Sequence, residues 1–176
     1  YGVSGPPEAR RGARLDSEVA MPFIVNRGAF IISPYFDFLS HFFGRGWPWR
    51  SGDVLSLMIK LADEPSGESG IGGIRKALTP VDKARLESAA ELAAEIMIRA
   101  GARRDGIVRG LINAGHPGGM FPLSAAERET VHHPALPPNV YIADASLLPE
   151  SLGKPPILTI LALAKRVGRV CRERLS

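Results

Sequence analysis

The sequence NAGHPGGM at residues 113–120 and the sequence NVYIADASLLPESLGKPPILTILALAKRV at residues 139–167 decide the fold of this chain. In the second, residues 139–143 are predicted to form a short buried strand, because an apolar run is bounded by turn residues. Pro155 and Pro156 then begin a helix, since the first N–H groups of a helix have no helical acceptor and proline lacks only such a group. Its apolar face consists of Ile157, Leu158, Ile160, Leu161, Leu163, Ala164, Val167 and Val170.

The middle of the chain predicts two strands and one long helix. Residues 53–63 are apolar with a partly alternating pattern, which favours a strand. Residues 74–78 return after a Gly-rich turn, and the two runs together predict an antiparallel pair. Thr79 and Pro80 are typical of a helix start, and Gly101 is typical of its end.

The first fifty residues give weaker signals. Residues 1–16 are rich in Gly, Pro and Arg and are interpreted as a flexible lead-in. Residues 17–50 hold both Trp and six of the seven Phe, in an irregular order that favours short strands and an aromatic loop. Within them, residues 23–49 are a candidate apolar substrate wall, against the simpler interpretation of an ordinary aromatic core.

Composition excludes several classes of protein. The 176 residues are 45% hydrophobic and 23% charged, as in an ordinary globular domain. Seventeen of the 22 basic residues are Arg, but they are spread along the chain, so the net charge of +4 indicates a solvated basic face and no nucleic-acid partner. A single cysteine, Cys171, excludes an intrachain disulfide and a cysteine-based metal cluster.

The sequence is also expected to carry no targeting signal. No apolar run approaches the roughly 20 residues that span a bilayer, and no signal peptide opens the chain, so a cytoplasmic protein is expected. The first residue is Tyr1 and not Met, which is expected of a piece of something longer.

His116 is the histidine best suited to chemistry. It stands among glycines, which let other groups approach closely, and histidine is the natural base near neutral pH. The alternative is a structural histidine. His132 and His133 lack partners at metal-ligand spacing, so no metal is expected. His41 lies in the aromatic segment, where packing is the simpler role.

A hydrolase is a third alternative. His116 and the glycines after it resemble the oxyanion-hole loop of lipases, and Ser146 and Asp144 would complete a triad. However, the chain contains no G-x-S-x-G elbow, which this interpretation requires.

The two quoted sequences resemble the C-terminal end of the glucose-methanol-choline (GMC) family of FAD-dependent oxidoreductases, with spacing similar to the cholesterol oxidase branch. The family pattern is H-P-x-G-[GT], then N-L-Y-V-x-D-[GA]-S-x-x-P, then N-P-x-x-T-I before the last helix. Residues 113–170 follow it nearly throughout, with the His and Asp about 28 residues apart. Residues 53–101 resemble the family's substrate domain more loosely.

The resemblance implies an α+β fold and a division into three segments. Residues 17–112 would form part of a substrate domain, an antiparallel sheet plus a helix, after the lead-in at 1–16. Residues 113–176 would supply the last strand and helix of a Rossmann-like FAD-binding domain, so the strand at 139–143 would have its neighbours in an N-terminal FAD-binding half of a longer protein.

The resemblance also implies roles for single residues. His116 would accept the proton of an alcohol substrate, a bulky and apolar one if the aromatic segment lines the site, while hydride passes to the flavin of FAD. The cofactor side would be formed by Asp144, Ala145, Ser146, Pro155, Pro156 and Ile157.

Two residues depart from the family pattern. Pro155 stands where the family has a second active-site Asn or His, and proline cannot donate a hydrogen bond to a substrate oxygen. Met120 replaces the usual Gly or Thr. Lys154 is a candidate substitute for the missing side chain. The alternatives are an altered activity, or a non-catalytic binding module derived from the same fold.

Overall fold

The computed structural model describes residues 2–5, 21, 23–35 and 55–175, and over these residues the fold is α+β. The chain forms two compact units. The first consists of Tyr1–Leu61 and Pro80–Asn113, and the second of Ala62–Thr79 and Ala114–Ser176. The second unit therefore combines the C-terminal segment predicted from the sequence with a short insertion from the middle of the chain.

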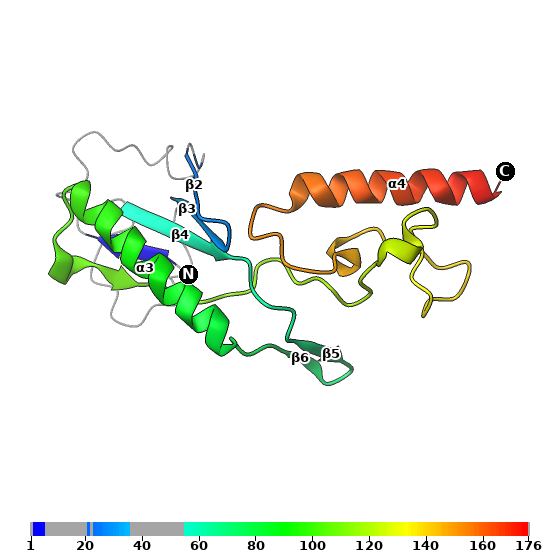
Figure 1. The fold of residues 1–176 in the computed structure, drawn as a ribbon, viewed down its shortest axis with the longest axis horizontal. Coiled ribbons are helices and arrows are strands. Elements are labelled where there is room, and N and C mark those ends of the chain that lie inside the picture. The colour runs from blue at the N-terminus through cyan, green and yellow to red at the C-terminus, as the bar shows by residue number, and fades with distance from the viewer. Residues whose placement is uncertain (1, 6–20, 22, 36–54, 176) are drawn as a thin grey trace. The chain divides into compact units, whose positions relative to one another are not determined.

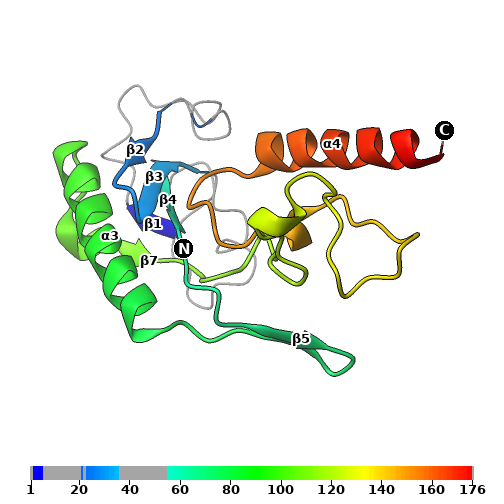
Figure 2. The same cartoon turned by 45° about the vertical axis from the view of Figure 1, so that its right-hand side comes forward.

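A five-stranded antiparallel sheet forms the body of the first unit, in the order β2-β3-β4-β1-β7 (Figures 1 and 2). The predicted strand at 53–63 is confirmed as the central strand β4, and Ile59 on it pairs with Ile32 on β3 in the buried middle of the sheet. The strands are β1 Gly2–Gly5, β2 Val25–Asn26, β3 Phe30–Pro34, β4 Leu55–Leu61 and β7 Val108–Arg109.

The long helix predicted after Thr79 is confirmed as α3, Pro80–Arg99, which packs against the sheet (Figure 2). Its buried face repeats at helical spacing and is lined by small alanines, which let the helix approach the strands closely. Gly101 ends the helix at φ +100°, and the amides of Gly101 and Ala102 donate to the carbonyls of Ile98 and Met97. This pair of bonds is a Schellman motif, so the predicted end is also confirmed.

The predicted pairing of residues 74–78 with residues 53–63 is wrong. β6, Gly73–Arg75, pairs with β5, Glu68–Gly70, in a separate two-stranded hairpin. The physical reason is that β4 has no edge available: β1 lies on one side of it and β3 on the other. Residues 73–75 therefore pair with residues 68–70, on the other side of the turn.

The flexible lead-in predicted at 1–16 is wrong for its first residues. Residues 2–5 form β1, because the ladders to β4 and β7 satisfy the backbone groups of this Gly-containing segment. Residues 6–16 lie outside the described part of the chain. Most of the predicted aromatic wall, from 36 to 49, also lies outside it, as does His41.

The second unit is built around the C-terminal helix α4, Ile157–Leu175, whose predicted start after two prolines is confirmed. Its core consists of Val131, Leu147 and Val167, with Phe121 and Tyr141 among the side chains packed on it. Short 3-10 turns at Ala125–Glu127 and Ala145–Leu147 shape the loops that face the helix, and a third turn, Arg104–Gly106, belongs to the first unit.

The predicted strand at 139–143 is absent from the structure. A strand needs a neighbour for its hydrogen bonds, and no strand in the described ranges pairs with this segment. Val140 instead donates its amide to the carbonyl of Pro137 in a turn. Two of the apolar side chains in this segment, Tyr141 and Ile142, are instead partly buried against the core of the second unit.

Over the residues that the structure covers, neither α3 nor α4 combines the length and apolar character that crossing a membrane requires.

Candidate active site

The two sequence motifs that are about 28 residues apart lie side by side in the second unit. Three backbone hydrogen bonds join residues 119–123 to residues 145–147, with N–O distances of 3.2, 2.9 and 3.0 Å. The pairs are Gly119 to Ala145, Phe121 to Ser146 and Leu123 to Leu147. The loop that carries His116 is thereby fixed against the turn that begins at Asp144.

Gly118 allows this close approach. A Cβ built on Gly118 would lie 2.7 Å from the carbonyl oxygen of Ala145, a distance that real Cβ atoms do not adopt. Gly119, beside it, has φ +75°, a conformation that favours glycine. The glycines that follow His116 are therefore needed for contact with the 144–147 turn and for the path of the loop.

Asp144 caps the turn with its side chain. Its Oδ1 accepts a hydrogen bond from the amide of Ser146 at 2.8 Å, which begins the 3-10 turn Ala145–Leu147. Ser146 is buried, whereas Asp144 and His116 are exposed. Three of the six residues predicted on the cofactor side lie in this turn: Asp144 is accessible, Ala145 is half-buried and Ser146 is buried.

Lys154 and Pro155 stand between two buried residues just before α4. Gly153 and Pro156 are buried, while Lys154 and Pro155 between them are exposed. The carbonyl of Pro156 accepts the first helical hydrogen bond, from Ile160. The loop is thus anchored on both sides, and it presents Lys154 and Pro155 to the solvent.

The first turns of α4 expose an unusual amount of apolar surface. Ile157, Leu158 and Leu161 are 61%, 81% and 59% exposed, whereas Val167 in the second half of the same helix is buried. A contiguous apolar patch on a surface often marks a place where another surface or a ligand packs. The α4 patch, as we call these three side chains, begins at the predicted cofactor residue Ile157.

Sequence reasoning missed a group of residues next to this loop. Asp63 follows β4, and its carboxylate lies 2.8 Å from the Nζ of Lys76 and accepts a hydrogen bond from the side chain of Ser151. Burial raises the pKa of Asp63, but these hydrogen bonds and the charge of Lys76 outweigh it and hold the pKa below its ordinary value. The signal in the sequence was KLADE at 60–64, which forms part of the looser resemblance to the family's substrate domain.

Three other carboxylates have shifted pKa values, and none of them is a residue of the candidate site. Hydrogen bonds from Arg109, Arg103 and Ser124 lower the pKa values of Glu87, Asp105 and Glu127, in that order. Among the residues that the structure describes, no three His, Cys, Asp or Glu side chains gather as metal ligands would.

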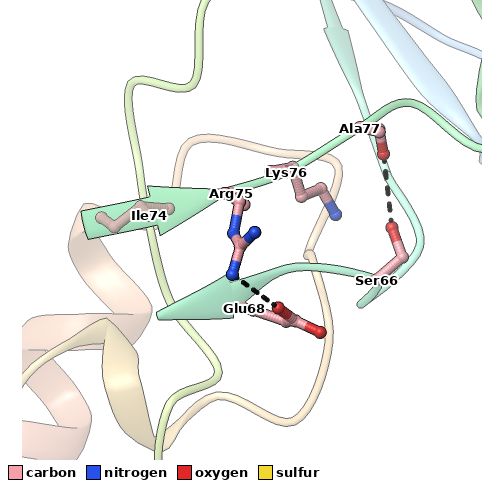
Figure 3. A pocket seen from close by; sticks show the side chains of 6 residues that line it. All are labelled: Ser66, Glu68, Ile74, Arg75, Lys76 and Ala77. Atoms are coloured by element: carbon pink, nitrogen blue, oxygen red, sulfur yellow. Dashed lines mark hydrogen bonds and ion pairs between the residues drawn. The ribbon is translucent and has the colours of Figure 1, made fainter. Parts of the chain in front are cut away.

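An open hollow of about 530 Å³ lies along the β5–β6 hairpin and not at the candidate site (Figure 3). Figure 3 shows the Glu68–Arg75 ion pair across the hairpin, at 3.8 Å, and the hydroxyl of Ser66 directed at the carbonyl of Ala77. Lys76 also lines the hollow, but its amine is engaged by Asp63 and by the carbonyl of Glu64. The hollow therefore lacks a converging set of polar groups.

Comparison with known proteins gives one relative of interest. No family model matches the chain. The chain is 32% identical over 120 residues to "Uncharacterized protein MJ1450" of Methanocaldococcus jannaschii. The match covers 68% of this chain but 30% of the relative, so the chain spans less than a third of that protein's length. The relative's name assigns no activity.

Proposed function

We propose that residues 1–176 are the C-terminal part of an FAD-dependent oxidoreductase of the GMC type, which oxidises a CH–OH group. The observation that carries this proposal is the contact between the two motifs of the resemblance. Residues 119–123 are hydrogen-bonded to residues 145–147, and Gly118 meets Ala145. A histidine loop and an Asp-Ala-Ser turn held together in this way form one surface, on which a cofactor and a substrate could both be bound.

The residues of this chain fit a flavin on chemical grounds. The accessible residues are His116, Asp144, Lys154 and Pro155. The apolar start of α4 follows Pro155 closely in the sequence. The first amides of α4 precede its first helical bond, so this end of the helix carries a partial positive charge that favours an anion. Asp144, Ala145, Ser146, Pro155, Pro156 and Ile157 would hold the cofactor.

His116 would act as the base. An alcohol releases hydride readily only when its hydroxyl proton is removed, and an imidazole is suited to this task near neutral pH. FAD, when bound, would supply the hydride acceptor. Exposure of His116 in a Gly-rich loop leaves room for a substrate hydroxyl to reach the ring.

Lys154 would take over the second polar position of the site. Pro155 lacks a side-chain donor, but the exposed ammonium of Lys154 is adjacent in the chain and can donate to an alcohol oxygen. A cation there would also stabilise negative charge on the substrate oxygen.

The α4 patch supports the proposal that the N-terminal FAD-binding half of a longer protein completes the fold. Three exposed apolar side chains at a helix start are expected to be covered in the complete protein. A bulky, apolar alcohol as substrate and a cytoplasmic location are parts of the same proposal.

A non-catalytic binding module derived from this fold is the second candidate. Pro155 favours it, because the proline removes the hydrogen bond that the family's Asn or His would make. Bound flavin in the complete wild-type protein would favour the enzyme over the module. If Pro155 is the reason for a weak or altered activity, Pro155→Asn should raise alcohol oxidation or broaden the substrate range.

The proposal is tested with His116→Ala in the complete protein. Purified wild-type protein should contain bound flavin, and an alcohol should bleach its absorbance under anaerobic conditions. His116→Ala should slow this reduction by roughly 10²–10⁴-fold, the usual contribution of a general base. Thermal stability should change little, within about 0.5 kcal/mol, because the side chain is exposed.

His132→Ala is the matched control for the loss of a histidine. His132 belongs to the same unit, where its ring is hydrogen-bonded to the carbonyl of Pro137 and packs edge-to-face against Tyr141, and the proposal gives it no role. The rate of flavin reduction should stay near the wild-type value in this variant. A wild-type protein that contains no flavin, or an unchanged rate in His116→Ala, would reject the proposed function.

A further inference from the structure

The loop that carries Lys154 and Pro155 is held at two points by two consecutive residues. Ala62 and Asp63, directly after β4, lie against Gly153 and Ser151. All four residues belong to the second unit. Two contacts from adjacent residues fix both the position and the direction of a short loop, whereas a single contact would leave it free to pivot.

The first contact is steric. A Cβ on Gly153 would lie 2.8 Å from the Cβ of Ala62 and 3.3 Å from its backbone nitrogen. Gly153 also has φ +59°, where a side chain is strained. The backbone next to Lys154 is therefore packed directly on the chain that leaves β4.

The second contact is polar and partly shielded. Asp63 accepts a hydrogen bond from Ser151 and pairs with Lys76 at 2.8 Å, and the two side chains of the ion pair are 33% and 27% exposed. Lys76 also donates to the carbonyl of Glu64, which fixes the ammonium group. Hydrogen bonds to charged groups are stronger than neutral ones, so the Ser151 contact gains from the fixed charge of Asp63.

We propose that Asp63, fixed by Lys76, is a positioning residue that sets the location of Lys154 and Pro155 through its contact with Ser151 and the packing of Gly153 on Ala62. The inference rests on the proposed function for its effect on chemistry. The anchoring of the loop is a separate claim and is measured without any activity. Asp63 is not among the residues proposed to hold substrate or cofactor, so its proposed effect on chemistry passes through the loop.

The test uses the complete protein with Asp63→Ala, which removes both polar contacts, and Ser151→Ala, which removes one. Hydrogen exchange is measured by mass spectrometry on peptides covering 150–160. Exchange there should become about tenfold faster or more in both variants, the size expected for loss of one hydrogen bond to a charged group. Peptides covering 119–123 should be unchanged, because their bonds go to 145–147.

Glu68→Ala is the matched control, and Lys76→Arg is the conservative variant that keeps the positive charge. Glu68 is an acidic residue of the same insertion whose ion pair with Arg75 is 80% and 90% exposed, so its loss should leave the loop unchanged. Arginine at position 76 preserves the positive charge, so Lys76→Arg should keep the slow exchange of the wild type.

The second readout is the rate of flavin reduction in the same variants. A positioning role predicts that Asp63→Ala lowers the rate at saturating alcohol by about tenfold, since misplaced groups slow a reaction even when binding survives. Lys76→Arg should retain the wild-type rate, and Glu68→Ala should too.

Each outcome decides a separate claim. Wild-type exchange in the loop of both Asp63→Ala and Ser151→Ala overturns the positioning role, whatever the activity. Faster exchange with an unchanged rate overturns the influence on chemistry. If the wild-type protein contains no flavin, the proposed function fails, and the exchange data alone decide whether Asp63 anchors the loop.

Discussion

A hydrogen atom in place of a side chain at Gly118 allows the His116 loop to lie against the turn at 144–147. The nearest atoms to an added Cβ are the backbone oxygen and carbon of Ala145, which cannot rotate away as a flexible side chain can. Gly153 has the same function against Ala62. Two glycines therefore determine how closely the loops of the candidate site approach their supports.

At this scale we expect Gly118→Ala to destabilise the protein by about 1–3 kcal/mol, the usual cost of overpacking. Chemical denaturation measures the change. The control is Gly72→Ala, since nothing lies within 4 Å of a Cβ at that position and no strained φ is involved. A Gly118→Ala protein as stable as the Gly72→Ala protein would show that the contact with Ala145 is not required.

At the scale of elements, the two long helices differ in how they are covered. α3 buries a continuous face, ending at Met97, against the sheet. Its Schellman motif satisfies the carbonyls of Met97 and Ile98 at the C-terminal end. α4 buries Val167 in its second half but leaves the α4 patch exposed at its start. The stability of α3 is thus supplied within the first unit, whereas the start of α4 has apolar surface that the rest of the second unit leaves exposed.

Truncation of the α3 face should be costly. Met97 has no exposed surface, so Met97→Ala should lower the free energy of unfolding by about 2–5 kcal/mol through lost burial and the cavity left behind. Met120→Ala is the control, because the Met120 side chain is exposed and its loss should cost about 0.5 kcal/mol or less. Equal denaturation midpoints for the two variants would contradict the core assigned to α3.

At the scale of the whole molecule, the chain is organised as two units that interleave in sequence. Residues 62–79 leave the first unit to join residues 114–176, so the C-terminal unit contains its own insertion from the middle of the chain. The positions His116, Asp144 and Lys154 all fall in this second unit. The candidate site is therefore carried by one compact body, which also contains Asp63 and Lys76.

Under the proposed function, a protein limited to residues 1–176 should not retain FAD, because the ADP end of the cofactor would be held by the N-terminal half. Gel filtration after incubation with FAD should yield colourless protein, whereas the complete protein should remain yellow. Stoichiometric flavin in the 176-residue protein after gel filtration would reject this division of the cofactor site.

The sequence by itself determined the elements whose signals are local. The central strand, the helix after Thr79 with its end at Gly101, and the helix after Pro155 and Pro156 each depend on side-chain periodicity and on residues at their own ends. The link between the His116 motif and the Asp144 motif came from the resemblance to the GMC family. The activity and the cofactor that this resemblance implies are proposals.

Only the tertiary structure decided which segments pair. It placed residues 74–75 against 68–69, because both edges of β4 were taken. It left 139–143 without a strand, because none of the described strands pairs with this segment. It also brought Asp63 to Ser151 across nearly ninety residues. Pairing and long-range contacts depend on which edges and surfaces remain available after other segments have packed, and no local pattern of residues contains that information.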